Sequence, residues 1–393
     1  SIASYSNFSN TVSDDLHRFR YTLSSSTKNI SGSEFSIETY ILFTHRLNDW
    51  AIVQENLFNA LKIYNLALNY NFNESASIWA GRKINPHIAN VGAIDGLQFE
   101  YKLNNFYSGV IAGTRPDFYN YGPDLNLFEY GVYVGQNHKL ANGFIQSSVA
   151  FIEQLNAKSI DRRFIYFQHS NSLIKKLNLF TSVEADLFKL ENNMPRSTIS
   201  LISFFISLNY RMSKMLSITG SYDNRKNVIY YETFRNYADE ILNQAIRQGY
   251  HLRINFHPIK NLNLGVNAGT RFRNEDPRKT KTLNSNLSII RVPVINGQFS
   301  LTASILQTPY VDGLIYGARF NKNIIKGKLN STALFRWIYF DYLNSNLSLI
   351  QDIGEIDLSY QLNKSLLLSV SHETTFQSDI IYNRLYINLK RTF

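Results

Sequence analysis

The sequence has no cysteine, which excludes a disulfide scaffold, a cysteine-ligated metal site and a cysteine nucleophile. Charged residues are also scarce, at 18% of the chain, against about 25% in ordinary soluble domains. No stretch reaches the roughly 18 consecutive apolar residues of a membrane-spanning helix. Phosphate-binding loops, dinucleotide-binding glycine motifs and calcium-binding acidic loops are absent as well. The sequence therefore predicts no cofactor, no metal and no bundle of membrane helices.

Aromatic residues are abundant, with 25 Tyr, 27 Phe and 3 Trp in 393 residues. Lys and Arg number 40 against 30 Asp and Glu, which gives a net charge of +10. These basic residues are scattered along the chain, whereas phosphate binding requires clustered positive charge. We therefore expect no nucleic-acid partner.

Alternation of apolar and polar residues dominates the chain, and this period of two is typical of strands with two different faces. It runs through residues 177–187, 250–257, 262–273 and 328–339. The alternating runs last about 10–14 residues, whereas strands of soluble proteins are usually about 5–6 residues long. Runs of this length can cross a bilayer at a tilt of about 45°. One face of each strand suits hydrocarbon and the other suits water.

Short polar joints alternate with longer, charged joints along the chain. The short ones include 73–75, 103–105, 210–214, 258–261, 295–298 and 363–364, and the long ones 84–93, 116–126, 191–196, 224–243 and 274–281. Tight turns at one end and longer loops at the other are typical of outer-membrane barrels. A soluble propeller would show a repeat of about 40 residues, and no such repeat is present. The sequence thus predicts an all-β, transmembrane, antiparallel up-and-down β-barrel of roughly 20–22 strands.

Two N-terminal segments depart from this pattern. Residues 1–14 are rich in Ser and Asn and show no period, so we expect a flexible periplasmic lead before a barrel of residues 15–393. Residues 50–59 fit either a short strand or a segment that plugs the lumen.

The final strand carries a resemblance to bacterial outer-membrane proteins. Leu385, Ile387 and Leu389 alternate with polar residues, and the chain ends on Phe393. The segments 80–83, 94–97 and 112–117 also resemble the strand ends of porin-like barrels, and the Asn-, Tyr- and Phe-rich composition is similar to that of Bacteroidota proteins. The resemblance implies a multi-pass protein of a Gram-negative outer membrane. It implies no catalytic residue.

Charged residues with lumen-facing parity are the candidate site. They are Arg253, Arg271, Arg273, Arg319, Arg336, Glu184, Asp186 and Asp223. In a water-filled lumen, opposed positive and negative rows would create a transverse field and set ion selectivity. Arg253, Arg271 and Arg273 form the best candidate for an anion-attracting patch. The alternative is that these residues pair with one another inside a filled barrel.

One segment has the residue types of a barrel phospholipase. His169, Ser170 and Asn171 are adjacent, but neighbouring residues of a strand point to opposite faces, which prevents the serine from using this histidine as its base. We therefore expect no enzymatic activity.

Two functions fit these features. The first is a porin-like channel for passive or weakly selective passage of small hydrophilic solutes, narrowed by a loop such as residues 228–248. The second is a closed structural barrel within a larger outer-membrane secretion or assembly complex. Large residues with inward parity favour a partly filled interior; they are Phe180, Phe205, Leu201, Ile290, Ile315, Leu334 and Ile338. The expected partners are outer-membrane lipid, small hydrophilic solutes and, in the second case, other outer-membrane or periplasmic proteins.

Overall fold

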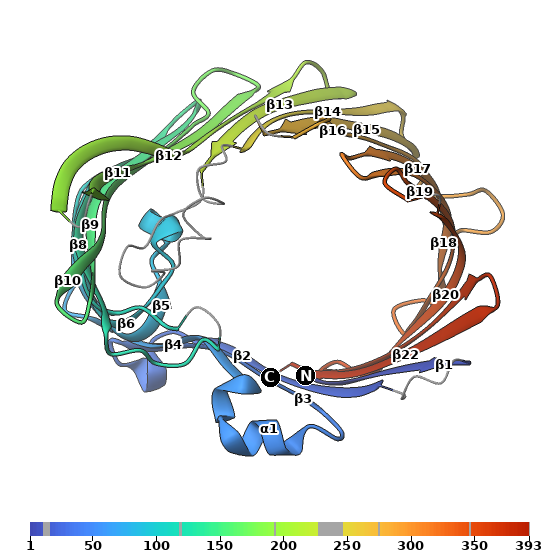
Figure 1. Cartoon of the computed structure of the whole chain (residues 1–393), viewed down its shortest axis with the longest axis horizontal. Helices are drawn as coiled ribbons and strands as arrows, with labels where there is room; N and C mark the ends of the chain where they lie inside the picture. The colour runs from blue at the N-terminus through green and yellow to red at the C-terminus, as the bar shows by residue number, and fades with distance from the viewer. Residues whose placement is uncertain are drawn as a thin grey trace.

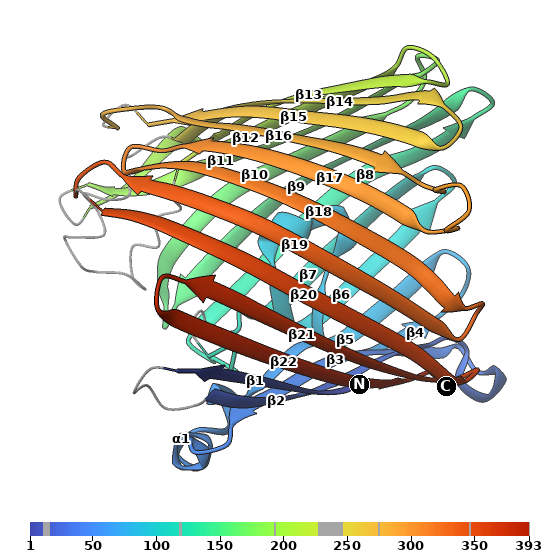
Figure 2. The ribbon, with the colours of Figure 1, turned by 90° about the vertical axis from the view of Figure 1, so that its right-hand side faces the viewer.

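The computed structural model describes residues 1–10, 16–117, 120–191, 194–226, 247–273, 276–345 and 347–392. They form one closed ring of 22 antiparallel strands, in which each strand pairs with the next and β22 pairs with β1 (Figure 1). Figure 2 shows the strands crossing the wall at a common tilt. The predicted up-and-down β-barrel and its strand number are confirmed.

The strands are 8 to 18 residues long. The first eleven are β1 (Ile2–Ser9), β2 (Leu16–Thr27), β3 (Phe35–Arg46), β4 (Leu61–Asn71), β5 (Ala76–Ile84), β6 (Ala93–Leu103), β7 (Phe106–Thr114), β8 (Leu127–Leu140), β9 (Gly143–Asn156), β10 (Ser159–Asn171) and β11 (Leu177–Glu191). The others are β12 (Met194–Arg211), β13 (Leu216–Arg225), β14 (Arg247–Ile259), β15 (Leu262–Phe272), β16 (Thr280–Ile289), β17 (Gln298–Gln307), β18 (Val311–Ile325), β19 (Leu329–Tyr342), β20 (Leu347–Asn363), β21 (Leu366–Gln377) and β22 (Ile380–Arg391).

Helical segments are short. They are η1 (Ile30–Gly32), α1 (Trp50–Glu55), η2 (Leu57–Asn59) and η3 (Pro86–Val91). No helix among the described residues is long and apolar enough to cross a membrane. Residues 50–59, which fitted a strand or a plug, form α1 and η2 instead, and α1 lies outside the ring (Figure 1).

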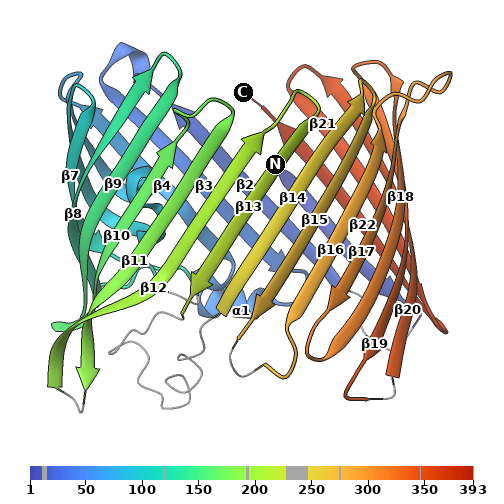
Figure 3. The same ribbon diagram turned by 90° about the horizontal axis from the view of Figure 1, so that it is seen from above.

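The joints predicted as short and those predicted as long lie at opposite ends of the barrel, as the alternation predicts. Joints from an even to an odd strand, such as 72–75 and 104–105, lie at one end, here called the turn end. The other joints lie at the opposite, loop end (Figure 3). Length is less regular than predicted, because the joints 157–158, 308–310 and 378–379 at the loop end are also tight. The predicted loop 191–196 is mostly strand, since β11 runs to Glu191 and β12 starts at Met194.

The expectation of a flexible lead is wrong for Ile2–Ser9. These residues form β1, which pairs with β2 on one side and β22 on the other and closes the barrel. At this seam Tyr5 lies opposite Tyr386 in one direction and Arg18 in the other. Main-chain pairing with two neighbours overrides the weak pattern of this strand, because a closed barrel satisfies every backbone group. Phe393 lies outside the described residues.

Candidate functional site

The inner face of the wall can be assigned from η3, which folds into the ring (Figure 1). Ile88 and Val91 of η3 are buried in one apolar cluster with strand residues that include Tyr107, Ile111 and Tyr133. These strand residues must therefore point inward. Side chains directly opposite each other on paired strands share a face, so the register carries this assignment around the barrel. The predicted long joint 84–93 therefore folds onto the lumen side of the wall through η3.

Two tyrosines, each packed over a glycine of the neighbouring strand, form part of the surface that η3 contacts. Tyr133 of β8 lies over Gly109 of β7, where an added Cβ would be 2.3 Å from the ring. Tyr107 lies in the same way over Gly135. The rings lie flat along the wall and form part of the surface on which η3 packs, so both glycines are required by close approach.

His87 fixes η3 to this surface. Its ring centroid is 4.0 Å from that of Tyr107, its Nε2 is 3.3 Å from Oε2 of Glu100, and its carbonyl accepts a hydrogen bond from Ser148 Oγ at 2.8 Å. Burial lowers the pKa of His87, although the Glu100 carboxylate acts in the opposite direction. In a neutral ring that donates from Nε2 to Glu100, Nδ1 carries no proton, so no N–H group is left unpaired there. This agrees with the burial of Nδ1 without a hydrogen-bond partner among the described residues.

The joint between β7 and β8 also packs on the wall. Lys62 Nζ donates to the carbonyl of Asn120, and Arg82 donates to the carbonyl of Tyr121 at 2.6 Å. Arg82 is in turn held by Asp95 through two charge-assisted hydrogen bonds, a strong, geometrically specific pairing. Together, η3 and this joint contact the wall from β4 to β10. The wall of β4–β11 is called the packed arc below.

Glu184 and Asp186 lie on the packed arc and are both buried. The two carboxylates bind Arg162 of β10, with 2.8 Å between Arg162 Nη2 and Asp186 Oδ1. Their negative charge is therefore used within the wall. For these two residues the alternative interpretation, a filled and internally paired barrel, describes the structure.

Further buried polar groups lie beside this cluster. Gln154 donates to Asp161 at 2.8 Å and accepts from Arg115 at 3.2 Å. Glu129 is 1% exposed, and its Oε1 has no hydrogen-bond partner among the described residues. The described part of the chain contains no group of three acidic, His or Cys residues that could hold a metal ion.

Arg336 belongs to a second charged row, on β19–β22. Its Nη2 is 3.3 Å from Glu355 and equally 3.3 Å from Glu373, which also binds Arg384. Asp223 lies inward on β13, and His251 Nε2 is 3.4 Å from its Oδ1. These charges are partly compensated but remain closer to solvent than those of the packed arc.

Three predicted arginines remain exposed on the inner wall: Arg253, Arg271 and Arg319. Arg253 donates to Asn267 at 2.6 Å, and none of the three has an acidic partner among the described residues. Arg253 and Arg271 share a face but are four register positions apart, about 13 Å at 3.3 Å per residue. Arg273 lies beyond the end of β15. The three arginines thus form a spaced row on β14, β15 and β18 in place of the predicted patch, with Arg319 as its third member instead of Arg273. The wall of β14–β19 that carries this row is called the open arc here.

The predicted inward apolar residues are placed in part as expected. Phe180 and Phe205 meet with ring centroids 6.0 Å apart, and Ile315 lies opposite Ile338. Leu201 points outward, because a bulge after Glu184 shifts the register and one extra residue reverses which face the next side chain occupies. Leu334 points inward beside Arg319, and Ile290 lies beyond the end of β16.

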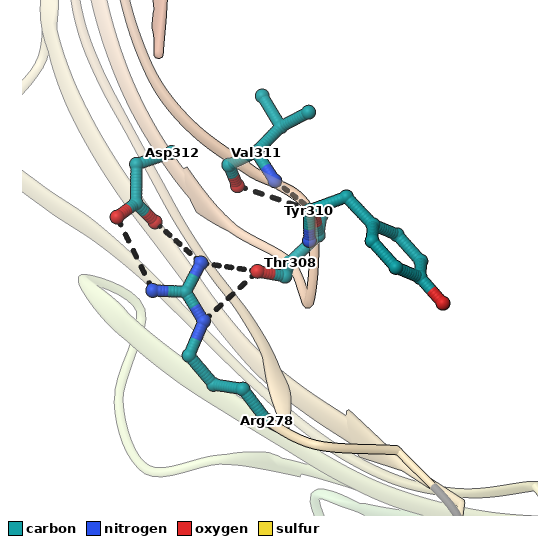
Figure 4. A network of polar contacts seen from close by, with 5 residues as sticks. All are labelled: Arg278, Thr308, Tyr310, Val311 and Asp312. Carbon is teal, nitrogen blue, oxygen red and sulfur yellow. Dashed lines mark hydrogen bonds and ion pairs between the residues drawn. The ribbon is translucent and has the colours of Figure 1, made fainter. Parts of the chain in front are cut away.

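Arg278 ties two joints at the loop end (Figure 4). Its guanidinium donates to both oxygens of Asp312, with 2.7 Å between Nη2 and Oδ1, and to the carbonyl of Thr308. This contact links the β15/β16 joint to the β17/β18 turn and fixes the mouth of the open arc. The predicted constriction 228–248 falls almost wholly outside the described residues.

His169 and Ser170 point to opposite faces of β10, as their adjacency predicts. The His169 ring instead contacts Ser147 Oγ on the neighbouring strand at 2.8 Å. Sequence reasoning missed η3, although the spacing by three of Ile88, Val91 and Ile94 was a signal for an apolar face on that joint.

Comparison with known proteins identifies the fold. No family model matches the sequence, and the search of curated proteins found no match. The P pilus usher (PapC) translocation pore is similar in structure, with TM-score 0.53, 11% identity and 100% of both chains covered. The ferric enterobactin receptor (PfeA) of Pseudomonas aeruginosa has TM-score 0.57 and 9% identity, covering 98% of this chain and 80% of that one. Both are outer-membrane β-barrels, and at these identities the likeness concerns the fold alone.

Proposed function

We propose that the protein is an outer-membrane channel through which small hydrophilic solutes, anions in preference, pass along the open arc. The observation that carries the proposal is the row of exposed, inward arginines Arg253, Arg271 and Arg319, none of which has an acidic partner among the described residues. Uncompensated positive charge on a water-facing wall attracts anions and repels cations. An internal network that served only stability would have paired them.

The exterior supports the location. Outward residues of many strands are large, apolar and exposed, for example Val132 at 52%, Phe335 at 52% and Ile356 at 57%. Such a continuous apolar surface favours lipid as the surrounding partner. In this proposal the turn end faces the periplasm, and the polar, aromatic-rich composition fits a Bacteroidota-type outer membrane.

The packed arc favours a second candidate function, a closed structural barrel of a secretion or assembly complex. Buried ion pairs such as Arg162 with Asp186 and the docked η3 fill one side of the lumen. A barrel that is filled around its whole circumference would conduct no ions, and its role would be to hold other outer-membrane or periplasmic proteins.

Single-channel recording in a planar bilayer under a salt gradient separates the two. A steady conductance with anion-selective reversal potential is expected for the wild type. Replacing Arg253, Arg271 and Arg319 together by Ala should shift the reversal potential toward cations. The control, Lys364→Gln, removes one positive charge from the β20/β21 turn and should leave the potential unchanged. Correctly folded protein that gives a silent bilayer would overturn the channel and leave the structural role.

A further inference from the structure

A hollow of about 540 Å³, lined mainly by polar residues, opens in the inner wall between β16 and β19. Its lining includes Asn286, Ser288, Gln298, Ser300, Arg319 and Arg336. This volume falls within the range of small-molecule sites, about 300–1,000 Å³. The hollow lies on the open arc, so a solute in the lumen can reach it.

The register builds this hollow from two adjacent rows. Ser288, Ser300 and Arg319 lie opposite one another in the first row. In the second row Gly317 lies opposite Arg336. A Cβ on Gly317 would be 2.6 Å from Thr302 Oγ1, so glycine keeps the floor of the hollow clear between two guanidinium groups.

The lining has hydrogen-bonding capacity to spare. Arg336 is engaged by Glu355 and Glu373, whereas Arg319 is exposed and has no ion pair among the described residues. Asn286 and Gln298 likewise make no side-chain hydrogen bond to the described part of the chain. Ser288 and Ser300 share one hydrogen bond of 2.8 Å, which leaves acceptor capacity on both oxygens.

We propose that this hollow binds a small polyhydroxy acid, a sugar acid by chemical class, as it moves through the lumen. The planar Arg319 guanidinium suits a carboxylate, which it can hold with two parallel hydrogen bonds. The amides of Asn286 and Gln298 can both donate to and accept from hydroxyl groups, and Leu334 offers an apolar surface to the carbon skeleton. The substrate class rests on the channel proposed above.

The test is isothermal titration calorimetry of the detergent-purified full chain with D-glucuronate, and with D-glucose as the neutral counterpart. Wild type should bind glucuronate more tightly than glucose. Arg319→Gln should weaken glucuronate binding by about tenfold or more, because a charge-assisted hydrogen bond is lost. Asn286→Asp, which adds a negative charge beside the carboxylate, should weaken it as well. Lys364→Gln is the charge-matched control and should leave binding unchanged.

The site and the channel fail in different ways. Binding in detergent needs no conduction, so a silent bilayer with Arg319-dependent glucuronate binding would overturn the channel and support the site. A conducting barrel that binds neither sugar, or binds both equally, would overturn the site and leave the channel standing. Equal losses in Arg319→Gln and Lys364→Gln would show an unspecific charge effect and also overturn the site. Heat-modifiable migration on gels confirms that each variant is folded.

Discussion

Removing the side chain of Ile88 should release η3 from the packed arc. Ile88 is 0% exposed and lies in an apolar cluster with Tyr107, Ile111 and Tyr133. Truncation of a fully buried isoleucine to alanine costs about 2–5 kcal/mol. The cluster is shared between η3 and the wall, so most of this cost falls on docking of the joint and little on the pairing of the strands. The free energy that opens η3 should fall by that amount.

Hydrogen exchange followed by mass spectrometry measures this opening. The amide of Ile88 donates to Asn85 and that of Gly92 to Ala89, so both are protected only while η3 is folded. In Ile88→Ala their exchange should accelerate between about 30-fold and a few thousandfold, since about 1.4 kcal/mol is tenfold. Ile324→Ala, at a position 55% exposed, is the control and should change nothing. Unchanged exchange in Ile88→Ala would show that burial of this side chain does not hold η3.

Three further outcomes are expected. In single-tryptophan variants reconstituted into brominated lipid, the fluorescence of the outward Trp337 should be quenched. The fluorescence of Trp79, which lies on the lumen side opposite Gln98, should not be quenched. Equal quenching of the two would refute the assigned faces. Gly109→Ala should destabilise the barrel by roughly 1–3 kcal/mol in thermal unfolding, as overpacking does, because the new Cβ meets the Tyr133 ring at 2.3 Å, and an unchanged Tm would contradict that contact. Burial lowers the pKa of His87, so its contribution to η3 docking is complete above about pH 6.5 and is lost as pH falls below it. Amide exchange in η3, corrected for the intrinsic exchange rate, should therefore accelerate on acidification in the wild type. In His87→Gln the pH dependence of this exchange should be flatter.

The barrel could be predicted from the sequence because its strands have two faces in different solvents. Where the outer face is polar the signal disappears. In β1 the outward positions Ser4 and Ser6 lie opposite Phe19 and His17, so the strand shows no apolar parity although its backbone is fully paired. Alternation identifies a strand by its side chains, whereas β1 is held by main-chain hydrogen bonds.

The period of apolar and polar residues does not show whether a joint folds into the lumen. Ile88 and Val91 give residues 85–92 an apolar spacing, but that spacing does not show which way the joint folds. Its docking depends on Gly109 and Gly135, whose tyrosine partners are set by the register of β7 and β8. The same limit applies to Leu201, where a bulge reverses parity. The alternation of residues along a strand correctly predicts that charged residues such as Arg319 point inward. It does not show whether such a charge is paired, because the partner can be distant in sequence, as Arg162 is from Glu184.

Substitutions on the packed arc and on the open arc should have different consequences. The packed arc holds buried carboxylates, docked joints and close-packed rings, so a substitution there changes folding first. Side chains of the open arc, such as Arg319 and Gln298, are truncated or exchanged at little cost in packing, since one side of each faces solvent. In the proposed channel, substitutions on the open arc can therefore change the preferred solute with little loss of barrel stability. The packed arc maintains the fold of the barrel, whereas the side chains of the open arc can vary.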